Sequence, residues 1–493
     1  MSTTSTDTRT YGHHIGGRSV PGDAQIERRS PATGQLVARF ADGTPQDVAA
    51  AVESARTTFD SGVWSDLPGA ERARVLLRLA ALVGERREQL ARVDADEVGK
   101  PLRLARGDVD ATVAHIEYAA ALAHELRGDT YTNLGPAYVG LVQREPAGVA
   151  GLITPWNFPV LSYGEKVAYA LAAGCTIVLK PSELTSGSAL EVTALAEEAG
   201  VPAGAINVVT GRGATVGQAL VESPGVDYVS FTGSTATGAR IAAAAAKTLK
   251  RVSLELGGKG ANIVLADADL DDAVDGALFA SFFNTGECCV AGSRLLVQDA
   301  IADAFVERLA ERARRIRVGG PDDDAAEIGA LIHEDHAEKV LDLIASGTAE
   351  GARLVCGGRR LDGEHADGVF VAPTVFDGVR PEARIFREEI FGPVMAVTRF
   401  GTVDEAIALA NDTAYGLGNS VWTKDLDTAL RMTRELQSGT VWVNTTIDGA
   451  PQMPFGGMKA SGYGRECGRA GLEEYTVLKS CVIRSGKRDP FFA

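Results

Sequence analysis

The 493-residue sequence predicts an α/β fold with two blocks, each built around a parallel sheet. The first observation is that short β-rich runs alternate with helical stretches from Gly148 onward. Such alternation favours a parallel sheet with helices on both faces. The second is that the same alternation resumes at about residue 261 and continues to 444. The third is the length, which allows two or three domains with substantial cores.

The N-terminal part contributes helices rather than parallel strands. Residues 1–43 show no helical period, so we expect only short extended pieces there. Thr44, Pro45 and Asp47 then mark the start of a helix, as an N-cap, a proline at the first position and an acid at the third. Apolar residues at helical spacing predict two further helices, over about 70–94 and 107–127.

Each block contributes five strands. In the first block we expect them over 149–153, 176–180, 206–210, 228–231 and 252–255. In the second block we expect them over 262–265, 295–298, 394–400, 420–423 and 441–444. A helix over 188–199, closed by Gly200, illustrates the segments between them. Ligands bind beyond the carboxyl ends of such strands, which is where the notable polar residues fall.

Two segments outside this pattern allow more specific predictions. Asp267, Asp269, Asp271 and Asp272 have the look of a calcium cluster, but the glycine and glutamate of an EF-hand loop are missing. We therefore expect the start of a helix, with acids in its first turn. The tail around Val477-Leu478 and 481–483 predicts an edge strand that needs a partner.

Composition excludes several classes of function. The net charge of −16, from 49 basic and 65 acidic residues, disfavours a nucleic-acid partner. No apolar run approaches the length of a membrane span, and the N-terminus lacks the apolar core of a signal peptide. The six cysteines are few and scattered, which suits a reducing cytoplasm. We expect a cytoplasmic protein with no membrane partner.

Cys288 and Cys289 stand between glycines in the stretch 282–294. Small neighbours allow another molecule to approach the backbone, and a thiolate there can attack a carbonyl carbon. A buried, inert thiol pair is the alternative, and it is the usual state of a cysteine. Zinc ligands normally come as a C-x2–4-C pair with a second pair nearby, so we expect no metal site.

Two strand ends carry candidate partners for such a thiol. Glu255 ends a strand in an apolar setting, where a carboxyl group has a raised pKa and serves as a general base. A salt bridge to Lys259 is the alternative. Asn157 follows the first strand, and its amide beside a cysteine N–H would form an oxyanion hole. A turn asparagine before Phe158-Pro159 is the alternative.

Glycines and charges at two other strand ends indicate a nucleotide. The pattern Gly211-x-Gly213-x-x-x-Gly217 has one residue too many for the usual dinucleotide fingerprint. Lys180 and Glu183 could hold ribose hydroxyls, and Glu183 would repel a 2′-phosphate, which favours NAD over NADP. A solvated loop pair is the alternative.

Together these parts resemble the aldehyde dehydrogenase superfamily over nearly the whole chain. Seven motifs stand in the family's order and spacing: Thr154-Pro155-Trp156-Asn157-Phe158-Pro159, Lys180-Pro181-Ser182-Glu183, Phe231-Thr232-Gly233-Ser234-Thr235, Glu255-Leu256-Gly257-Gly258-Lys259, Gly286-Glu287-Cys288-Cys289, Glu388-Glu389-Ile390-Phe391-Gly392-Pro393 and Pro454-Phe455-Gly456-Gly457-x-Lys459-x-Ser461-Gly462. Their collinearity makes chance resemblance very improbable.

The resemblance implies a role for each matching residue. Cys289, the second residue after Glu287, matches the nucleophile; Glu255 matches the general base and Asn157 the oxyanion amide. Glu466 matches a second acid that relays protons. The positions that match NAD-binding residues are Ile153, Thr154, Pro155, Trp156, Lys180, Ser182, Glu183, Gly213, Phe231, Gly233, Ser234, Leu256, Glu389 and Phe391. The positions assigned to the aldehyde are Phe158, Tyr163, Phe283 and Ile447.

It also implies an architecture of two Rossmann-like parallel-sheet domains and a small β oligomerisation element. We expect an NAD-binding domain over 1–124 and 147–257, a catalytic domain over 258–459, and the oligomerisation element over 125–146 and 475–493. Because this element pairs subunits in the family, we expect a homodimer or homotetramer.

The expected reaction is NAD-dependent oxidation of an aldehyde to a carboxylic acid through a thioester on Cys289. Glu165 stands where many relatives carry a tryptophan, which favours a cationic substrate such as an aminoaldehyde or betaine aldehyde. A glutamate turned into a salt bridge is an equal alternative. The rival functions are a CoA-acylating semialdehyde dehydrogenase, against which the presence of Glu255 argues, and a catalytically silent binding or structural homologue.

Overall fold

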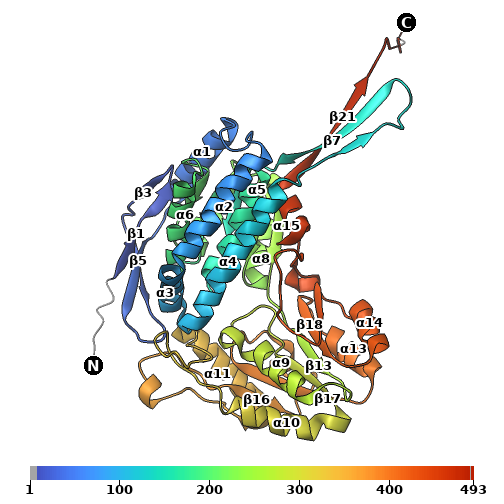
Figure 1. Ribbon diagram of the computed structural model, residues 1–493. Coiled ribbons are helices and arrows are strands. Elements are labelled where there is room, and N and C mark those ends of the chain that lie inside the picture. Colours follow the sequence, from blue (N-terminus) through green and yellow to red (C-terminus); the bar gives the residue numbers. More distant parts are fainter. Residues whose placement is uncertain (1–7, 489, 493) are drawn as a thin grey trace.

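The computed structural model describes residues 8–488 and 490–492. Part of the N-terminal segment predicted over 1–43 (residues 1–7) and two residues of the tail (489 and 493) lie outside the described residues. The chain forms an α/β fold with two large sheets, as predicted (Figure 1). Both sheets are parallel in their centres and mixed at their edges. Among the described residues, no helix combines the length and the apolar character that a bilayer crossing requires.

The first large sheet has eight strands in the order β20-β12-β11-β8-β9-β10-β2-β3. Their bounds are β20 Gly462–Tyr463, β12 Arg251–Glu255, β11 Tyr228–Thr232, β8 Val149–Ile153, β9 Thr176–Lys180, β10 Ile206–Val208, β2 His13–Ile15 and β3 Arg18–Val20. The five central strands fall where the sequence predicts them. The chain returns to this sheet late, since β20 pairs antiparallel with β12 and sets Gly462 opposite Glu255.

The helices that cover this sheet include a long group from the N-terminal part of the chain. Their bounds are α1 Pro45–Asp60, α2 Gly69–Glu85, α3 Arg87–Val98, α4 Leu102–Ala123, α5 Pro159–Ala173, α6 Gly187–Ala199, α7 Gln218–Glu222, α8 Thr235–Ala245 and α15 Gly468–Glu474. Thr44 caps α1 in a capping box with Asp47, as its sequence predicts. The single helix expected over 70–94 is wrong: the chain breaks at Arg86, where α2 ends and α3 begins.

The second large sheet has seven strands in the order β15-β16-β17-β14-β13-β18-β19. Their bounds are β15 Arg353–Cys356, β16 Thr374–Asp377, β17 Val394–Phe400, β14 Arg294–Gln298, β13 Ala261–Val264, β18 Gly418–Trp422 and β19 Thr440–Val443. Its helices are α9 Leu270–Phe282, α10 Asp299–Ala313, α11 Glu334–Ala349, α12 Arg384–Arg387, α13 Val403–Asn411 and α14 Leu426–Glu435. Asp269 caps α9 by accepting from the N–H groups of Asp271 and Asp272, so the acidic cluster is the start of a helix.

Two small sheets complete the fold. β1 Arg9–Tyr11, β5 Leu36–Ala41 and β4 Gln25–Arg29 form one, so residues 8–43 are more regular than the sequence predicts. β21 Thr476–Arg484, β7 Tyr138–Pro146 and β6 Asp129–Tyr131 form the other, in which the tail finds the partner it needs. Figure 1 shows β7 and β21 as an arm that leaves the body of the protein.

The packing of α4 against α5 positions one wall of the site. Both helices are buried along one face in the largest apolar core, which also holds the first sheet. Pro159 occupies the first turn of α5, where its missing N–H leaves no helical hydrogen bond unmade. Asn157 and Phe158 lie just before that turn, so their side chains are fixed by a rigid helix start rather than by a free loop.

Candidate active site

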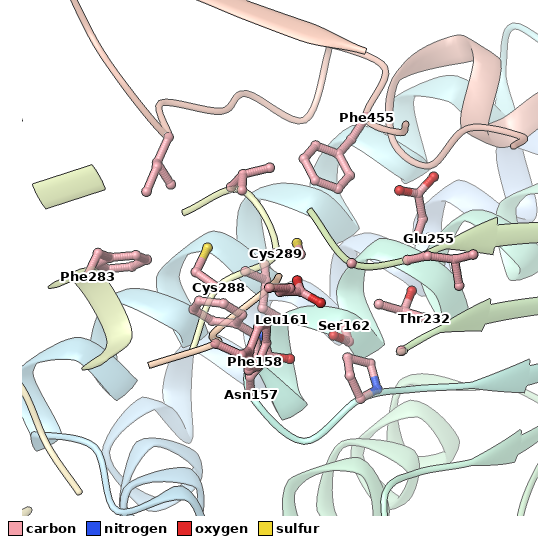
Figure 2. Close-up of a pocket in the computed structure, with 18 of the residues that line it drawn as sticks. Asn157, Phe158, Leu161, Ser162, Thr232, Glu255, Phe283, Cys288, Cys289 and Phe455 are labelled. Carbon is pink, nitrogen blue, oxygen red and sulfur yellow. The ribbon is translucent and has the colours of Figure 1, made fainter. Parts of the chain in front are cut away.

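A cavity of about 1670 Å³ lies between the two large sheets and the helices α4 and α5. Cys289, Glu255 and Asn157 all line it, although they come from three distant segments. Figure 2 shows Cys289 between Phe283 on one side and Glu255 on the other, with Asn157 beneath it. The fold therefore brings the three residues that the sequence analysis selected as catalytic candidates into one cavity.

The loop before the cysteines is held in an unusual backbone conformation. Asn284, Thr285 and Gly286 have φ values of 50°, 62° and 74°, so two residues other than glycine adopt the left-handed region. Such residues persist only where neighbours hold them in place. Asn284 Nδ2 donates to the backbone oxygens of Asn157 at 3.2 Å and of Glu287 at 3.1 Å. The loop that presents the thiols is thus tied to the segment that precedes α5.

The two thiols differ in exposure. Cys288 is buried, with 5% of its surface exposed, whereas Cys289 is partly exposed in the cavity. The adjacent Cys288 thiol and burial raise the pKa of Cys289, so its thiol needs a base to become a nucleophile. The Cys289 N–H donates to no other group within the described part of the chain. This N–H is therefore available to an oxygen beside the thiol.

Asn157 is positioned by hydrogen bonds rather than by a turn alone. Its side chain is buried, and Nδ2 donates to the Glu287 backbone oxygen at 3.0 Å. Its own backbone oxygen accepts from Lys100 Nζ at 2.9 Å. The second N–H of this amide is left for a ligand in the cavity. Because Glu287 lies two residues before Cys289 in the sequence, the hydrogen bond holds the amide close to the thiol. An amide donor and a backbone donor beside one thiol can stabilise an oxyanion.

Glu255 is buried at the end of β12, with 3% of its surface exposed. Within the described residues neither of its carboxylate oxygens has a hydrogen-bond partner, and Lys259 Nζ has none either. The salt bridge between these two side chains is therefore not formed. Burial first, and then the nearby Glu466 carboxylate, raise the pKa of Glu255 well above its usual value. A carboxyl group in this state suits a general base.

Glu466 lies behind Glu255 in a polar cluster. Its Oε1 accepts hydrogen bonds from Lys166 Nζ and, at 3.2 Å, from Ser230 Oγ. Lys166 Nζ also contacts Ser230 Oγ at 2.7 Å. Both Lys166 and Glu466 are buried, so the pair brings charge close to Glu255 in a region shielded from water. Pairing β20 with β12 is what places this segment beside Glu255.

The residues assigned to the cofactor fall into two groups. One group lines the cavity: Pro155, Trp156, Gly233, Ser234, Leu256, Glu389 and Phe391. The other does not line it but lies at or near the carboxyl ends of β8 to β11 in the same sheet: Ile153, Thr154, Lys180, Ser182, Glu183, Gly213 and Phe231. Lys180 Nζ donates to Glu183 Oε2 at 2.8 Å, so the two side chains act as one charged pair.

Several details of the first group suit a nucleotide. Ser234 caps α8 and accepts from the Thr237 N–H, so the positive end of an eleven-residue helix faces this side of the cavity. Thr232 Oγ1 is buried without a partner among the described residues. Glu389 Oε1 accepts from the Gly258 N–H at 2.8 Å, and burial raises the pKa of Glu389 to about 7.

The residues assigned to the aldehyde are placed less uniformly. Phe158 and Phe283 stack with ring centroids 5.9 Å apart, and both line the cavity with Ile447. Tyr163 does not line it: its ring is 1% exposed in the core against α6, and its hydroxyl lies 3.4 Å from Thr193 Oγ1. The structure therefore gives no support to Tyr163 as a substrate residue, because it lies on the core-facing side of α5.

Glu165, which the sequence analysis relates to a cationic substrate, meets other cavity residues that the sequence analysis did not assign. Glu165 lines the cavity, and burial raises its pKa to about 8. His115 from α4 lies beside it, with Nε2 4.0 Å from the carboxylate, and Cys467 lines the same wall. Trp442 adds an aromatic surface. No motif links these positions, so only the fold could reveal that they meet.

Comparison with known proteins agrees with this geometry. The model of the aldehyde dehydrogenase family matches residues 19–481. A betaine aldehyde dehydrogenase of Bacillus subtilis (strain 168) is 45% identical over 459 residues, which cover 93% of this chain and 94% of that protein. An NAD-dependent aldehyde dehydrogenase of Sinorhizobium meliloti has a TM-score of 0.97 at 47% identity, covering 99% of this chain and 97% of its own. A betaine aldehyde dehydrogenase of Staphylococcus aureus, solved in complex with NAD+, has a TM-score of 0.96 at 38% identity, and the match covers 98% of this chain and 97% of that chain. On its sequence, fold and cavity, this chain belongs to the aldehyde dehydrogenase family.

Proposed function

We propose that this protein oxidises an aldehyde to the carboxylic acid, with NAD as hydride acceptor and Cys289 as the covalent nucleophile. The observation that carries the proposal is that Cys289, Glu255 and Asn157 line one cavity while the Glu255 carboxylate has no partner in the described chain. A buried carboxylate without a partner lowers the stability of the fold. A catalytic role explains why such a group is present, because a general base must be free to accept a proton from water.

NAD fits the residues on the far side of the cavity. The N-terminus of α8, capped by Ser234, suits a pyrophosphate, and Thr232 Oγ1 is a buried hydroxyl that lacks a partner among the described residues. The Lys180–Glu183 pair would bind the ribose hydroxyls, and the Glu183 charge disfavours a 2′-phosphate. When bound, NAD accepts the hydride that leaves the substrate carbon.

The first half of the reaction forms a bond between carbon and sulfur. The Cys289 thiol loses its proton, and the sulfur attacks the aldehyde carbon to give a hemithioacetal. The Asn157 amide and the Cys289 N–H donate to the oxygen that gains charge. Loss of hydride from the carbon then leaves a thioester on Cys289. Because the pKa of Cys289 is raised, a base has to accept the thiol proton.

The second half hydrolyses the thioester. Glu255 accepts a proton from a water molecule, and the oxygen attacks the acyl carbon. The carbon–sulfur bond breaks, the acid leaves, and the Cys289 thiolate is restored. Glu466, held by Lys166 and Ser230, lies close enough to raise the pKa of Glu255 and would take the proton onward. The net reaction is aldehyde, NAD+ and water to acid, NADH and a proton.

The substrate side of the cavity favours an aldehyde with a cationic end. Phe158, Phe283 and Trp442 offer aromatic surfaces, and trimethylammonium groups bind over such rings. Glu165 supplies a carboxylate on the same wall. The similarity to betaine aldehyde dehydrogenases supports the same class. An aminoaldehyde or betaine-type aldehyde is therefore the substrate that we propose.

The proposal includes assembly and location. The arm of β7 and β21 exposes apolar side chains, including Val139, Leu478, Val482 and Ile483. A second copy that covered them would remove a flat apolar edge from water, so we propose a homodimer or homotetramer. All six cysteines are free thiols, which suits the reducing cytoplasm. Light scattering after gel filtration would measure the subunit number, and a monomer would contradict the assembly.

The test of the function is product analysis with NAD and a panel of aldehydes, with and without coenzyme A. NADH and free acid without coenzyme A support the hydrolytic enzyme. Formation of an acyl-CoA, and only with coenzyme A, would support the acylating rival instead. NAD binding with no turnover of any aldehyde would favour the silent homologue. A trimethylammonium aldehyde, an aminoaldehyde and a neutral aromatic aldehyde should be compared, because they differ in charge.

A further inference from the structure

Three side chains with metal-binding atoms meet on the wall of the cavity. They are His115 from the middle of α4, Glu165 from the second turn of α5, and Cys467, which directly precedes α15. One ligand atom from each lies within 4.8 Å of the other two. Among the described residues, this is the one group of three or more His, Cys, Asp or Glu side chains that is spaced closely enough to hold a metal ion. The cluster is independent of the proposed covalent chemistry, since neither Cys289 nor Glu255 belongs to it.

The separations are somewhat longer than those of a tetrahedral zinc site. Glu165 Oε1 is 4.0 Å from His115 Nε2, and one ligand atom from each of the three residues lies within 4.8 Å of the other two. Zinc bonds of about 2.0–2.3 Å place neighbouring tetrahedral ligands about 3.3–3.8 Å apart. Side-chain movements of about 1–1.5 Å would therefore bring the three ligand atoms to these separations. Thiolate, imidazole and carboxylate together are a ligand set that zinc accepts.

The surroundings hold the ligands in place. His115 and Cys467 are 9% and 3% exposed, and Cys467 has φ of 58°, a left-handed conformation that a residue other than glycine adopts only when its neighbours enforce it. The Tyr169 hydroxyl donates to the Pro451 backbone oxygen at 3.1 Å and lies 3.5 Å from His115 Nδ1. Its oxygen can accept the Nδ1 proton, which leaves Nε2 free to bind a metal, as outer partners of metal-binding histidines commonly do.

We propose that His115, Glu165 and Cys467 form a binding site for a divalent transition metal of the zinc type. All three residues line the cavity, so the fourth coordination position faces the cavity rather than protein. An open position of this kind accepts water or an oxygen or nitrogen donor of a small molecule. Occupancy would also neutralise Glu165 on the wall where we place the cationic end of the substrate.

The test uses cobalt as a spectroscopic probe, because a cobalt–thiolate bond gives a charge-transfer band and tetrahedral cobalt gives strong visible bands. The vicinal thiols can bind metal themselves, so the double variant C288A/C289S serves as the background. This protein, stripped with a chelator and titrated with cobalt, should bind one equivalent and show both features. Absence of a thiolate band in this background would overturn the proposal.

Matched variants in that background locate the site. Cys467→Ser should remove the thiolate band, whereas Cys481→Ser, which changes a thiol on β21, should leave it intact. Loss of a residue that only hydrogen-bonds a metal ligand lowers metal affinity by about 10–100-fold. His115→Gln removes a ligand itself, so it should lower the affinity for cobalt by more than that. It also provides the test if Cys467→Ser fails to fold. A band retained in both Cys467→Ser and His115→Gln would overturn the assignment.

Discussion

The Asn157 side-chain amide donates a hydrogen bond to the backbone oxygen of Glu287 at 3.0 Å. This bond joins the segment after β8 to the loop that carries Cys289, although the two lie far apart in the sequence. It holds the amide beside the nucleophile before any substrate arrives. Preorganised donors stabilise a developing charge without the cost of rearrangement.

We predict that Asn157→Ala lowers kcat by about 10²–10³-fold, the usual loss for one oxyanion donor. The substitution removes the donor to the substrate oxygen and the tie to the Glu287 backbone oxygen. Steady-state kinetics would measure the loss, and a thermal melt would show whether the fold survives. Asn157→Asp is the matched control, because it keeps the shape and replaces the donor by an acceptor. Full activity in either variant would exclude the oxyanion role.

Cys289 and Cys288 give a second prediction, since Cys289 is partly exposed and Cys288 is buried, although both line the cavity. Cys289→Ala should abolish NADH formation, because no other thiol can replace the carbon–sulfur bond. Cys288→Ala should retain turnover, because the Cys288 thiol forms no bond to the substrate and its effect on Cys289 is to raise the pKa of the nucleophile. The reverse result, with activity lost only in Cys288→Ala, would reassign the nucleophile.

Glu255 predicts a pH dependence. Burial and Glu466 raise its pKa, while Lys166 and Arg465 lower it and Glu165 raises it further. The base must be deprotonated to accept a proton from water, so hydrolysis should increase as pH rises through the raised pKa. The rise should therefore lie at higher pH than an ordinary glutamate would give. Profiles of kcat against pH for the wild type and Glu255→Gln would test this. A rise that persists unchanged in Glu255→Gln would assign it to another group.

Glu165 predicts charge selectivity. Glu165→Gln keeps the shape and removes a group that is a charged carboxylate above its pKa of about 8, so above that pH the KM for a trimethylammonium aldehyde should rise about tenfold, or about 1.4 kcal/mol. KM for a neutral aromatic aldehyde should stay the same. Equal changes for the two substrates would show that Glu165 acts on the cavity as a whole and not on the cationic group.

The buried pair of Lys166 and Glu466 predicts a stability effect. Removing one charge leaves the other buried without a partner, so Lys166→Met should lower the free energy of unfolding by about 3–5 kcal/mol. Adding Glu466→Gln removes the second charge and should recover part of that loss. Thermal midpoints of the two single variants and the double variant would measure the coupling. Additive losses would show that the pair contributes no mutual stabilisation.

Much of the fold followed from local patterns, and the site followed from motifs. The five strands from 149 to 255 were predictable because each buried strand is a short apolar run with a turn after it. The break between α2 and α3 was not, because the apolar spacing continues through Arg86. Tyr163 does not line the cavity, although its neighbours in sequence Ser162 and Glu165 do, because its own side of α5 faces the core.

Contacts that form only through the tertiary structure left no signal in the sequence. His115, Glu165 and Cys467 come from α4, α5 and the segment after β20, and no spacing rule connects them. The polar cluster of Lys166 with Glu466 depends on β20 pairing with β12. Long-range pairing of this kind is set by the packing of whole elements, which local propensity does not encode.

The most direct test is mass spectrometry of Glu255→Gln after mixing with NAD and an aldehyde. Without its base the enzyme should form the thioester but hydrolyse it slowly, so a protein heavier by the mass of the aldehyde less two hydrogen atoms should accumulate. Peptide mapping should place the acyl group on Cys289. An unmodified protein that still forms NADH, or an acyl group on Cys288, would contradict the account.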